Sequence, residues 1–260
     1  MKRKTFVSKL LTLLIALVIT ISCSSAMRAQ ASPNEGVINL SVYALYGGGD
    51  SSSSSGSDDM GHAWIVVENG TGNIYDFYNT LMIGGETFSI GTWGTRVDPD
   101  TGKKVKKAWL NLESYFQMVG ASTVSLTIEI TEKQLETVSK KCIELNNWGL
   151  VNNCSYFASH VWNEVAPEGM KVNSYFFPAN FPKTLKASIQ KISGYQTNRK
   201  IDKNSFIGYC DSSTHFKYIP ESDVDPLALR EFGQMIAQSN RYSSFPIEYD
   251  SYDKLVSACT

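Results

Sequence analysis

The strand-like segments of this chain come before its two amphipathic helices, and this order most constrains the fold. Residues 37–46, 61–68, 73–78, 86–92 and 123–130 are rich in the β-branched and aromatic residues that favour strands. Helical spacing of apolar residues follows only after Thr131 and Gln134, which form a capping-box pattern, and again from Cys154. Strands grouped ahead of helices predict an α+β fold with an antiparallel sheet packed against helices.

Two loops divide the early strands. Residues 69–72 read Asn-Gly-Thr-Gly, and an Asn-Gly pair between β-rich runs is typical of a tight hairpin. We therefore expect residues 61–68 to pair with residues 73–78. Residues 47–59 are mostly glycine, serine and aspartate, which predicts a flexible low-complexity loop.

The first 31 residues have the pattern of a secretory signal peptide. Basic residues at positions 2–4 precede an apolar run over residues 10–21, and residues 29–31, Ala-Gln-Ala, form a small-residue cleavage signal. The run is shorter than the roughly 20 residues of a membrane-spanning helix. We predict a secreted protein with no stable membrane span. Cys23 lies in a sequence that loosely resembles a lipobox, so lipid anchoring through Cys23 is the alternative.

Charge narrows the classes of partner. The chain has 24 Lys and Arg and 25 Asp and Glu, and cleavage after Ala31 would remove five basic residues and no acidic one. The mature chain would then carry 19 basic and 25 acidic residues, a net charge of −6. This balance argues against nucleic-acid binding and against electrostatic attraction to anionic membranes or wall polymers.

The remaining length allows one substantial core, or a domain of roughly 150 residues with an extension. We place a domain at residues 32–190 and a C-terminal extension of unknown role at residues 191–260, where the patterning is weak. The cysteines left after cleavage are too few for a disulfide scaffold, although a bridge between Cys210 and Cys259 stays open. Cys142 lies in the apolar stripe of the first helix and is interpreted as a core residue.

Cys154 follows two asparagines at the predicted start of the second helix. Amide groups at a helix start stabilise a thiolate and lower its pKa, so Cys154 is a candidate nucleophile, although a small buried residue is the other interpretation. Backbone amides of Cys154 and Ser155 could form an oxyanion hole, with help from the side chain of Asn152 or Asn153. Helix capping is the simpler role for both asparagines.

A nucleophilic cysteine needs a base, and the chain offers three histidines. His160 follows Cys154 by six residues on the same helix, about 240° around its axis, so it points elsewhere. His215 lies in the weakly patterned C-terminal part. His62 begins a convincing strand, which positions a base more rigidly, and we select it. The chain has no closely spaced Cys/His ligands, so we predict no metal site, and no cofactor is implied.

Two motifs resemble those of a known superfamily. Residues 61–67, Gly-His-Ala-Trp-Ile-Val-Val before a Gly/Asn turn, resemble the histidine strand of the NlpC-type cell-wall cysteine peptidases. Residues 153–158, Asn-Cys-Ser-Tyr-Phe-Ala, resemble the Asn-Cys-x-x-Phe motif of their circularly permuted relatives, the lecithin:retinol acyltransferase-like and PPPDE families. The histidine strand precedes the cysteine helix, as in the permuted branch. The resemblance spans roughly residues 37–167.

The resemblance implies a permuted papain-like fold in which the helix starting at Cys154 packs against the sheet that carries His62. It also implies that Cys154 is the nucleophile, that His62 is the base and that Asp76, on the strand after the histidine strand, orients the imidazole. Asp76 alternates with apolar neighbours, so a solvent-facing strand residue is its other interpretation.

The function implied by the resemblance is that of a secreted cysteine hydrolase. It would cleave an amide bond in a peptide, isopeptide or cell-wall peptide through a thioester intermediate. Lipid acyl transfer or thioesterase chemistry on the same fold is an alternative, and so is a secreted binding protein that has lost catalysis. The sequence does not fix the oligomeric state.

Overall fold

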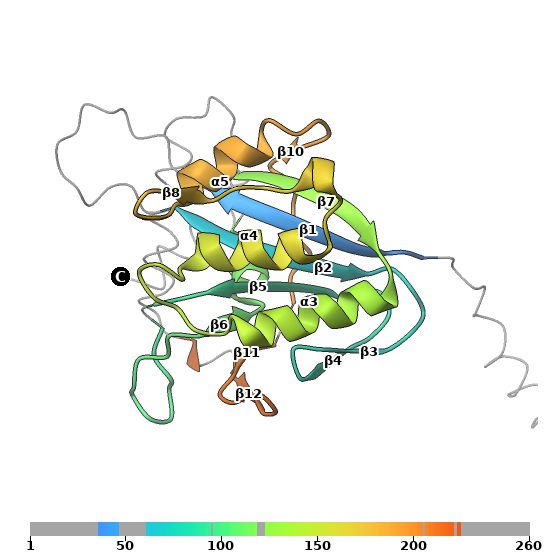
Figure 1. The fold of residues 1–260 in the computed structure, drawn as a ribbon. Helices are drawn as coiled ribbons and strands as arrows, with labels where there is room; N and C mark the ends of the chain where they lie inside the picture. The colour runs from blue at the N-terminus through green and yellow to red at the C-terminus, as the bar shows by residue number, and fades with distance from the viewer. Residues whose placement is uncertain are drawn as a thin grey trace, which may run out of the picture. The chain divides into compact units, whose positions relative to one another are not determined.

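The computed structural model describes residues 36–46, 61–94, 96–118, 123–204, 206–220 and 223–224 (Figure 1). The expectations for the leader with Cys23, for the loop at residues 47–59 and for Cys259 lie outside these residues. No helix within the described ranges combines the length and the apolar character needed to cross a membrane.

An eight-stranded sheet forms the centre of the fold, in the order β10-β7-β1-β2-β5-β6-β11-β12. Every neighbouring pair is antiparallel. The strands are β1 (Ile38–Leu45), β2 (His62–Asn69), β5 (Thr87–Thr92), β6 (Ala108–Leu110), β7 (Thr123–Ile130), β10 (Gln196–Thr197), β11 (Ile207–Cys210) and β12 (Phe216–Ile219). The predicted α+β class with an antiparallel sheet is confirmed.

Helices cover the sheet on both faces. Three of them, α3 (Glu132–Glu144), α4 (Cys154–Val165) and α5 (Pro182–Ile189), lie on one face (Figure 1). Alternate strand residues such as Leu40 and Val42 pack against them in the larger core cluster. The intervening residues, including Tyr43, face a second cluster that contains Leu112 of the short helix α2 (Leu112–Tyr115).

The predicted start of the first helix is confirmed. Thr131 is the N-cap of α3, and its side chain accepts a hydrogen bond from the Gln134 backbone while the Gln134 side chain accepts one from the Thr131 backbone. Leu135, Val138 and Cys142 are buried on one face of this helix, as their spacing predicts.

The predicted pairing of residues 61–68 with residues 73–78 is wrong. β2 pairs with β1 and β5, and the chain leaves the sheet at Asn69. The Asn69 side chain is buried and donates hydrogen bonds to the carbonyl oxygens of Asn73 at 2.9 Å and Met82 at 3.4 Å. These bonds turn the backbone outward instead of closing a tight hairpin.

A separate hairpin forms from β3 (Tyr75–Phe77) and β4 (Thr80–Met82). Its two-residue turn is Tyr78 and Asn79, with φ angles of 55° and 58°. Positive φ at both central positions is what a type I′ hairpin turn requires, and asparagine tolerates it. The hairpin therefore turns at these residues and not at residues 69–72.

The sheet continues past residue 190, where the sequence suggested a domain boundary. β11 pairs with β6, and Ile207, Cys210 and Phe216 are buried in the two core clusters. Between α4 and β10 lie a 3₁₀ turn (Glu168–Met170), the small hairpin β8 (Tyr175–Phe176) with β9 (Ala179–Asn180), and α5. The described part of residues 191–260 thus belongs to the same core.

Candidate active site

Cys154 is the first residue of α4, and Asn153 is its N-cap. Asn153 Oδ1 accepts hydrogen bonds from the backbone N–H groups of Ser155 at 3.0 Å and Tyr156 at 3.2 Å. Its Nδ2 donates to the Asn180 carbonyl oxygen at 2.6 Å. The Asn153 side chain and the Ser155 amide are therefore engaged in capping, and the Cys154 side chain is 8% exposed at the helix start.

His62 is the first residue of β2, and its ring stacks on that of Trp64, two residues along the strand, with centroids 5.6 Å apart. Its Nε2 lies 2.9 Å from Oε1 of Glu113, and the two residues are 3% and 0% exposed. A carboxylate can only accept a hydrogen bond, so Nε2 carries a proton whether the ring is neutral or charged. Nδ1 is then the ring nitrogen left for Cys154.

Cys154 and His62 shift each other's pKa in opposite directions. Burial alone would raise the pKa of the Cys154 thiol, but the charge of the His62 imidazolium and its hydrogen bond to sulfur lower it below the ordinary value. Burial disfavours the charged imidazole, yet the Cys154 thiolate and the Glu113 carboxylate raise the pKa of His62 to about 9. The arrangement favours a thiolate–imidazolium pair near neutral pH.

The Glu113 side chain is held by residues of β2 and β5 and by Trp93, which follows β5. Its Oε1 also accepts a hydrogen bond from Trp93 Nε1 at 3.0 Å, and its Oε2 accepts one from Ser89 Oγ at 3.1 Å. Asn111, at a φ of 64°, starts α2 and accepts the Ser89 backbone N–H at 3.0 Å through its side chain. The buried Glu113 side chain thus accepts hydrogen bonds from three donors, His62, Trp93 and Ser89.

The side chains of His62 and Glu113 approach the backbone of Gly91 closely, and this contact requires glycine. A Cβ at position 91 would lie 2.4 Å from Glu113 Oε1 and 3.0 Å from His62 Nε2. The Trp93 ring packs on the His62 imidazole with centroids 3.9 Å apart. Glycine on β5 leaves room for the pair, and the indole covers it.

Asp76, the predicted orienting residue, lies elsewhere. It is exposed on β3, in the separate hairpin, and the residue that bonds His62 is Glu113. Sequence reasoning missed Glu113 because no strand or helix periodicity marks it. The one available signal was a charged residue inside the largely apolar stretch 108–116.

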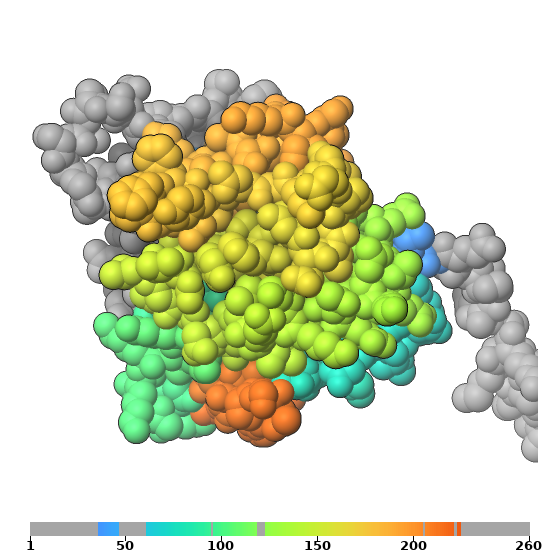
Figure 2. All heavy atoms as spheres, viewed as in Figure 1, coloured from blue at the N-terminus to red at the C-terminus, as the bar shows by residue number. Residues whose placement is uncertain are grey.

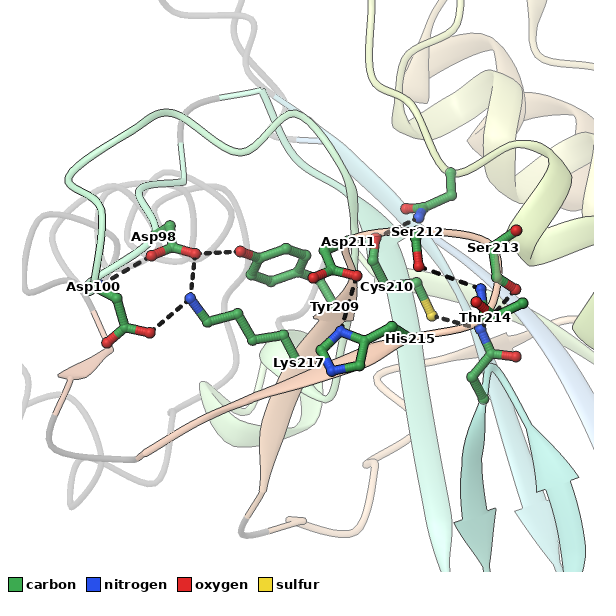
Figure 3. Close-up of polar contacts among 12 residues, drawn as sticks. Asp98, Asp100, Tyr209, Cys210, Asp211, Ser212, Ser213, Thr214, His215 and Lys217 are labelled. Atoms are coloured by element: carbon green, nitrogen blue, oxygen red, sulfur yellow. Dashed lines mark hydrogen bonds and ion pairs between the residues drawn. The ribbon is translucent and has the colours of Figure 1, made fainter.

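The other histidines stand apart from Cys154. His160 is exposed, stacks on Tyr156 with ring centroids 3.8 Å apart, and donates from Nδ1 to the Tyr156 carbonyl oxygen at 2.9 Å. His215 is exposed, and its Nδ1 lies 2.9 Å from Asp211 Oδ1 (Figure 3). The predicted direction of His160 away from Cys154 is confirmed.

Figure 3 also shows the ion pairs that Lys217 of β12, near His215, forms with two aspartates. Lys217 Nζ lies 2.6 Å from Asp98 and 2.7 Å from Asp100. Burial opposes ionisation of Asp98, but its hydrogen bonds from Lys217 and Tyr209 hold the pKa of the carboxyl well below its usual range. This cluster ties β11 and β12 to the loop after β5.

The remaining described cysteines are buried free thiols. Burial raises the pKa of Cys142, and burial raises the pKa of Cys210 to about 11. Among the cysteines of the described ranges, Cys154 alone combines a lowered pKa with a neighbouring histidine. No group of three or more His, Cys, Asp or Glu side chains in those ranges is arranged to hold a metal ion.

Comparison with protein-family models, curated proteins and solved structures gives no match for this chain. The site therefore rests on its own geometry.

Proposed function

We propose that this protein is an exported cysteine hydrolase of the permuted papain-like class, with Cys154 as nucleophile and His62 as base. The observation that carries the proposal is the Cys154–His62–Glu113 series, in which the pKa of the thiol is lowered and the pKa of the imidazole is raised to about 9. Glu113, in place of Asp76, takes the orienting role.

The chemistry follows from the protonation states. The Cys154 thiolate attacks the carbonyl carbon of an amide, and the His62 imidazolium donates its proton to the nitrogen as the C–N bond breaks. A thioester and a free amine result. Neutral His62 then takes a proton from water, the hydroxide attacks the thioester, and a carboxylic acid leaves as the thiolate–imidazolium pair is restored.

The oxyanion of both tetrahedral intermediates needs N–H donors. Because the Ser155 amide is engaged with Asn153, we assign this role to the Cys154 backbone amide at the first position of α4. The positive end of the helix dipole adds to the stabilisation. The substrate proposed first is a peptide, isopeptide or cell-wall peptide.

A second candidate is acyl transfer or thioester hydrolysis on a lipid. It is favoured by the exposed apolar residues Leu150 and Val151, immediately before the capped start of α4. Both candidates pass through an acyl-Cys154 intermediate, and they differ in the acyl donor.

The test is to mix the protein with matched amide and ester donors, peptidic and long-chain, and to look for an acyl group on Cys154 by mass spectrometry after rapid quenching. Cys154→Ala should abolish acylation and turnover, whereas Cys142→Ala should lower stability and spare both. An acyl adduct on Cys142, or loss of turnover in a folded Cys142→Ala variant, would contradict the assignment.

A further inference from the structure

Residues 171–200 differ in charge from the rest of the chain. The whole sequence is slightly acidic, with a net charge of −1, yet this segment contains six basic residues and no acidic one. They are Lys171, Lys183, Lys186, Lys191, Arg199 and Lys200. Electrostatic attraction acts over a Debye length of about 8 Å, so a local excess of positive charge matters even in an acidic protein.

The same segment exposes large aromatic rings. Phe176 and Phe177, in the β8–β9 hairpin, are 68% and 79% exposed, and Tyr175 and Phe181 beside them are also exposed. In Figure 2 the yellow and orange surface of this hairpin and α5 forms one side of the molecule. A cluster of exposed rings on a soluble domain marks a surface that binds something apolar.

Among the described residues, the lysines of α5 and Lys191 after it have no acidic partner. Lys183 and Lys186 on α5 contact Tyr46, with Lys183 Nζ 5.4 Å from the ring and Lys186 Nζ 3.5 Å from the carbonyl oxygen. Lys183, Lys186 and Lys191 form no ion pair with any residue in the described ranges. Lys171 and Arg199 are neutralised by Glu168 and Glu68.

This surface adjoins the candidate active site on two sides. Asn180 of β9 donates to the Val151 carbonyl oxygen at 3.1 Å and accepts from Asn153, the cap of the Cys154 helix, at 2.6 Å. Tyr46, which the lysines contact, follows the β1 residue that pairs with His62. A partner bound here would lie at the mouth of the site.

We propose that Tyr175, Phe176, Phe177, Phe181, Lys183, Lys186 and Lys191 form a docking surface for an anionic lipid bilayer. The aromatic rings enter the interface between headgroups and acyl chains, and the lysines pair with anionic headgroups. Both observations fit a bilayer, because a soluble polyanion would meet the lysines but leave Phe176 and Phe177 in water. The proposal does not depend on catalysis by Cys154.

The test is sedimentation of the purified protein with vesicles of phosphatidylcholine alone or mixed with phosphatidylglycerol, at low and high salt. We expect binding to the mixed vesicles at low salt, with weaker binding at high salt and to phosphatidylcholine alone. Phe176→Ser with Phe177→Ser should weaken binding about tenfold or more. The matched control, Leu81→Ser with Ile83→Ser, removes exposed apolar side chains outside the segment and should bind normally.

A second pair of variants tests the charges. Lys183→Ala with Lys191→Ala should reduce binding to the mixed vesicles, whereas Lys133→Ala with Lys140→Ala, on exposed positions of α3, should not. Cys154→Ala should bind like the unaltered protein, so docking and catalysis can fail separately. No binding to the mixed vesicles, or equal binding by the Phe176/Phe177 variant and its control, would overturn the proposal. Binding to soluble polyphosphate without vesicle binding would also overturn it.

Discussion

Glu113 shows how one buried charge can organise a site. The carboxylate is fully buried, yet it accepts hydrogen bonds from His62, Trp93 and Ser89, which offset the cost of removing it from water. Because both of its oxygens are engaged, the carboxylate has one orientation. The imidazole therefore presents Nδ1 in one direction, toward Cys154.

Glu113→Gln should weaken the site while keeping its shape. A hydrogen bond to a charged group contributes about 1.5–3 kcal/mol, so we expect catalytic efficiency to fall roughly 10- to 150-fold. The pKa of Cys154 should rise, because the imidazolium loses its supporting anion. The measurement is kcat/KM against pH. Glu144→Gln, at an exposed position on α3, is the control, and an unchanged Glu113→Gln profile would refute the positioning role.

Gly91→Ala should separate His62 from Glu113. The added Cβ would lie 2.4 Å from Glu113 Oε1, so the carboxylate must move. We expect slow alkylation of Cys154 near pH 6 and a cooperative unfolding transition that is retained at lower stability. Gly72→Ala, where the Cβ would meet nothing within 4 Å, should leave both measurements unchanged. Normal alkylation of Gly91→Ala would count against the described geometry.

The pH range of the ion pair follows from the two shifts. Cys154 loses its proton below the ordinary thiol pKa, and His62 keeps its proton until about pH 9, so the charged pair is populated between these limits. The thiolate is a larger cause of the raised His62 pKa than Glu113 is. In Cys154→Ala the His62 pKa should therefore fall well below 9, as an NMR titration of the His62 ring protons can measure. A His62 pKa near 9 in both proteins would contradict the coupling.

At the scale of elements, the start of α4 links sequence to site most directly. Asn153 caps the helix, so local chemistry alone places Cys154 at its first position, as it places Thr131 before α3. The hairpin at β3–β4 was not predictable in this way, because the Asn69 side chain bonds the carbonyl oxygens of Asn73 and Met82. These side-chain bonds, which strand patterning does not reveal, accompany the turn away from the sheet.

Asn153→Ala and Thr131→Ala form a matched pair. Each removes an N-cap, which costs about 1 kcal/mol of unfolding free energy, and Asn153→Ala also loses the bond to Asn180. Both should unfold at lower denaturant concentration. Only Asn153→Ala should slow the alkylation of Cys154, because Cys154 is the first residue of α4 and Thr131 caps a different helix, α3. Equal alkylation rates in the two variants would argue against a role for the cap in the site.

At the scale of the whole molecule, the sheet pairs strands from both sides of residue 190, where the sequence analysis placed the end of the domain. Strand patterning predicted β1, β2, β5 and β7, and helix caps predicted α3 and α4. The elements that carry Cys154 and His62 could therefore be predicted from the sequence. The β6–β11 pairing was not, because β11 and β12 are too short for a clear period. Glu113 could not be predicted as a site residue for a related reason, because only tertiary contacts bury it.

A chain shortened to residue 190 should therefore fail to fold. It would lose β10, β11 and β12, the ion pair of Arg199 with Glu68, and the buried residues Ile207 and Phe216. Circular dichroism on heating should show no cooperative transition. A chain ending at residue 224 keeps every described element and is the comparison. Cooperative unfolding of the shorter chain would contradict this prediction and support a domain that ends at residue 190.

The central claim is that His62 holds Cys154 as a thiolate. The most direct measurement is the rate of iodoacetamide alkylation at each cysteine from pH 5 to pH 9, read by mass spectrometry, with and without His62→Ala. We predict that Cys154 reacts rapidly at pH 6 and that His62→Ala slows this reaction. Alkylation of Cys154 that rises only near the free-thiol pKa of about 8.5, or that is indifferent to His62→Ala, would contradict the account.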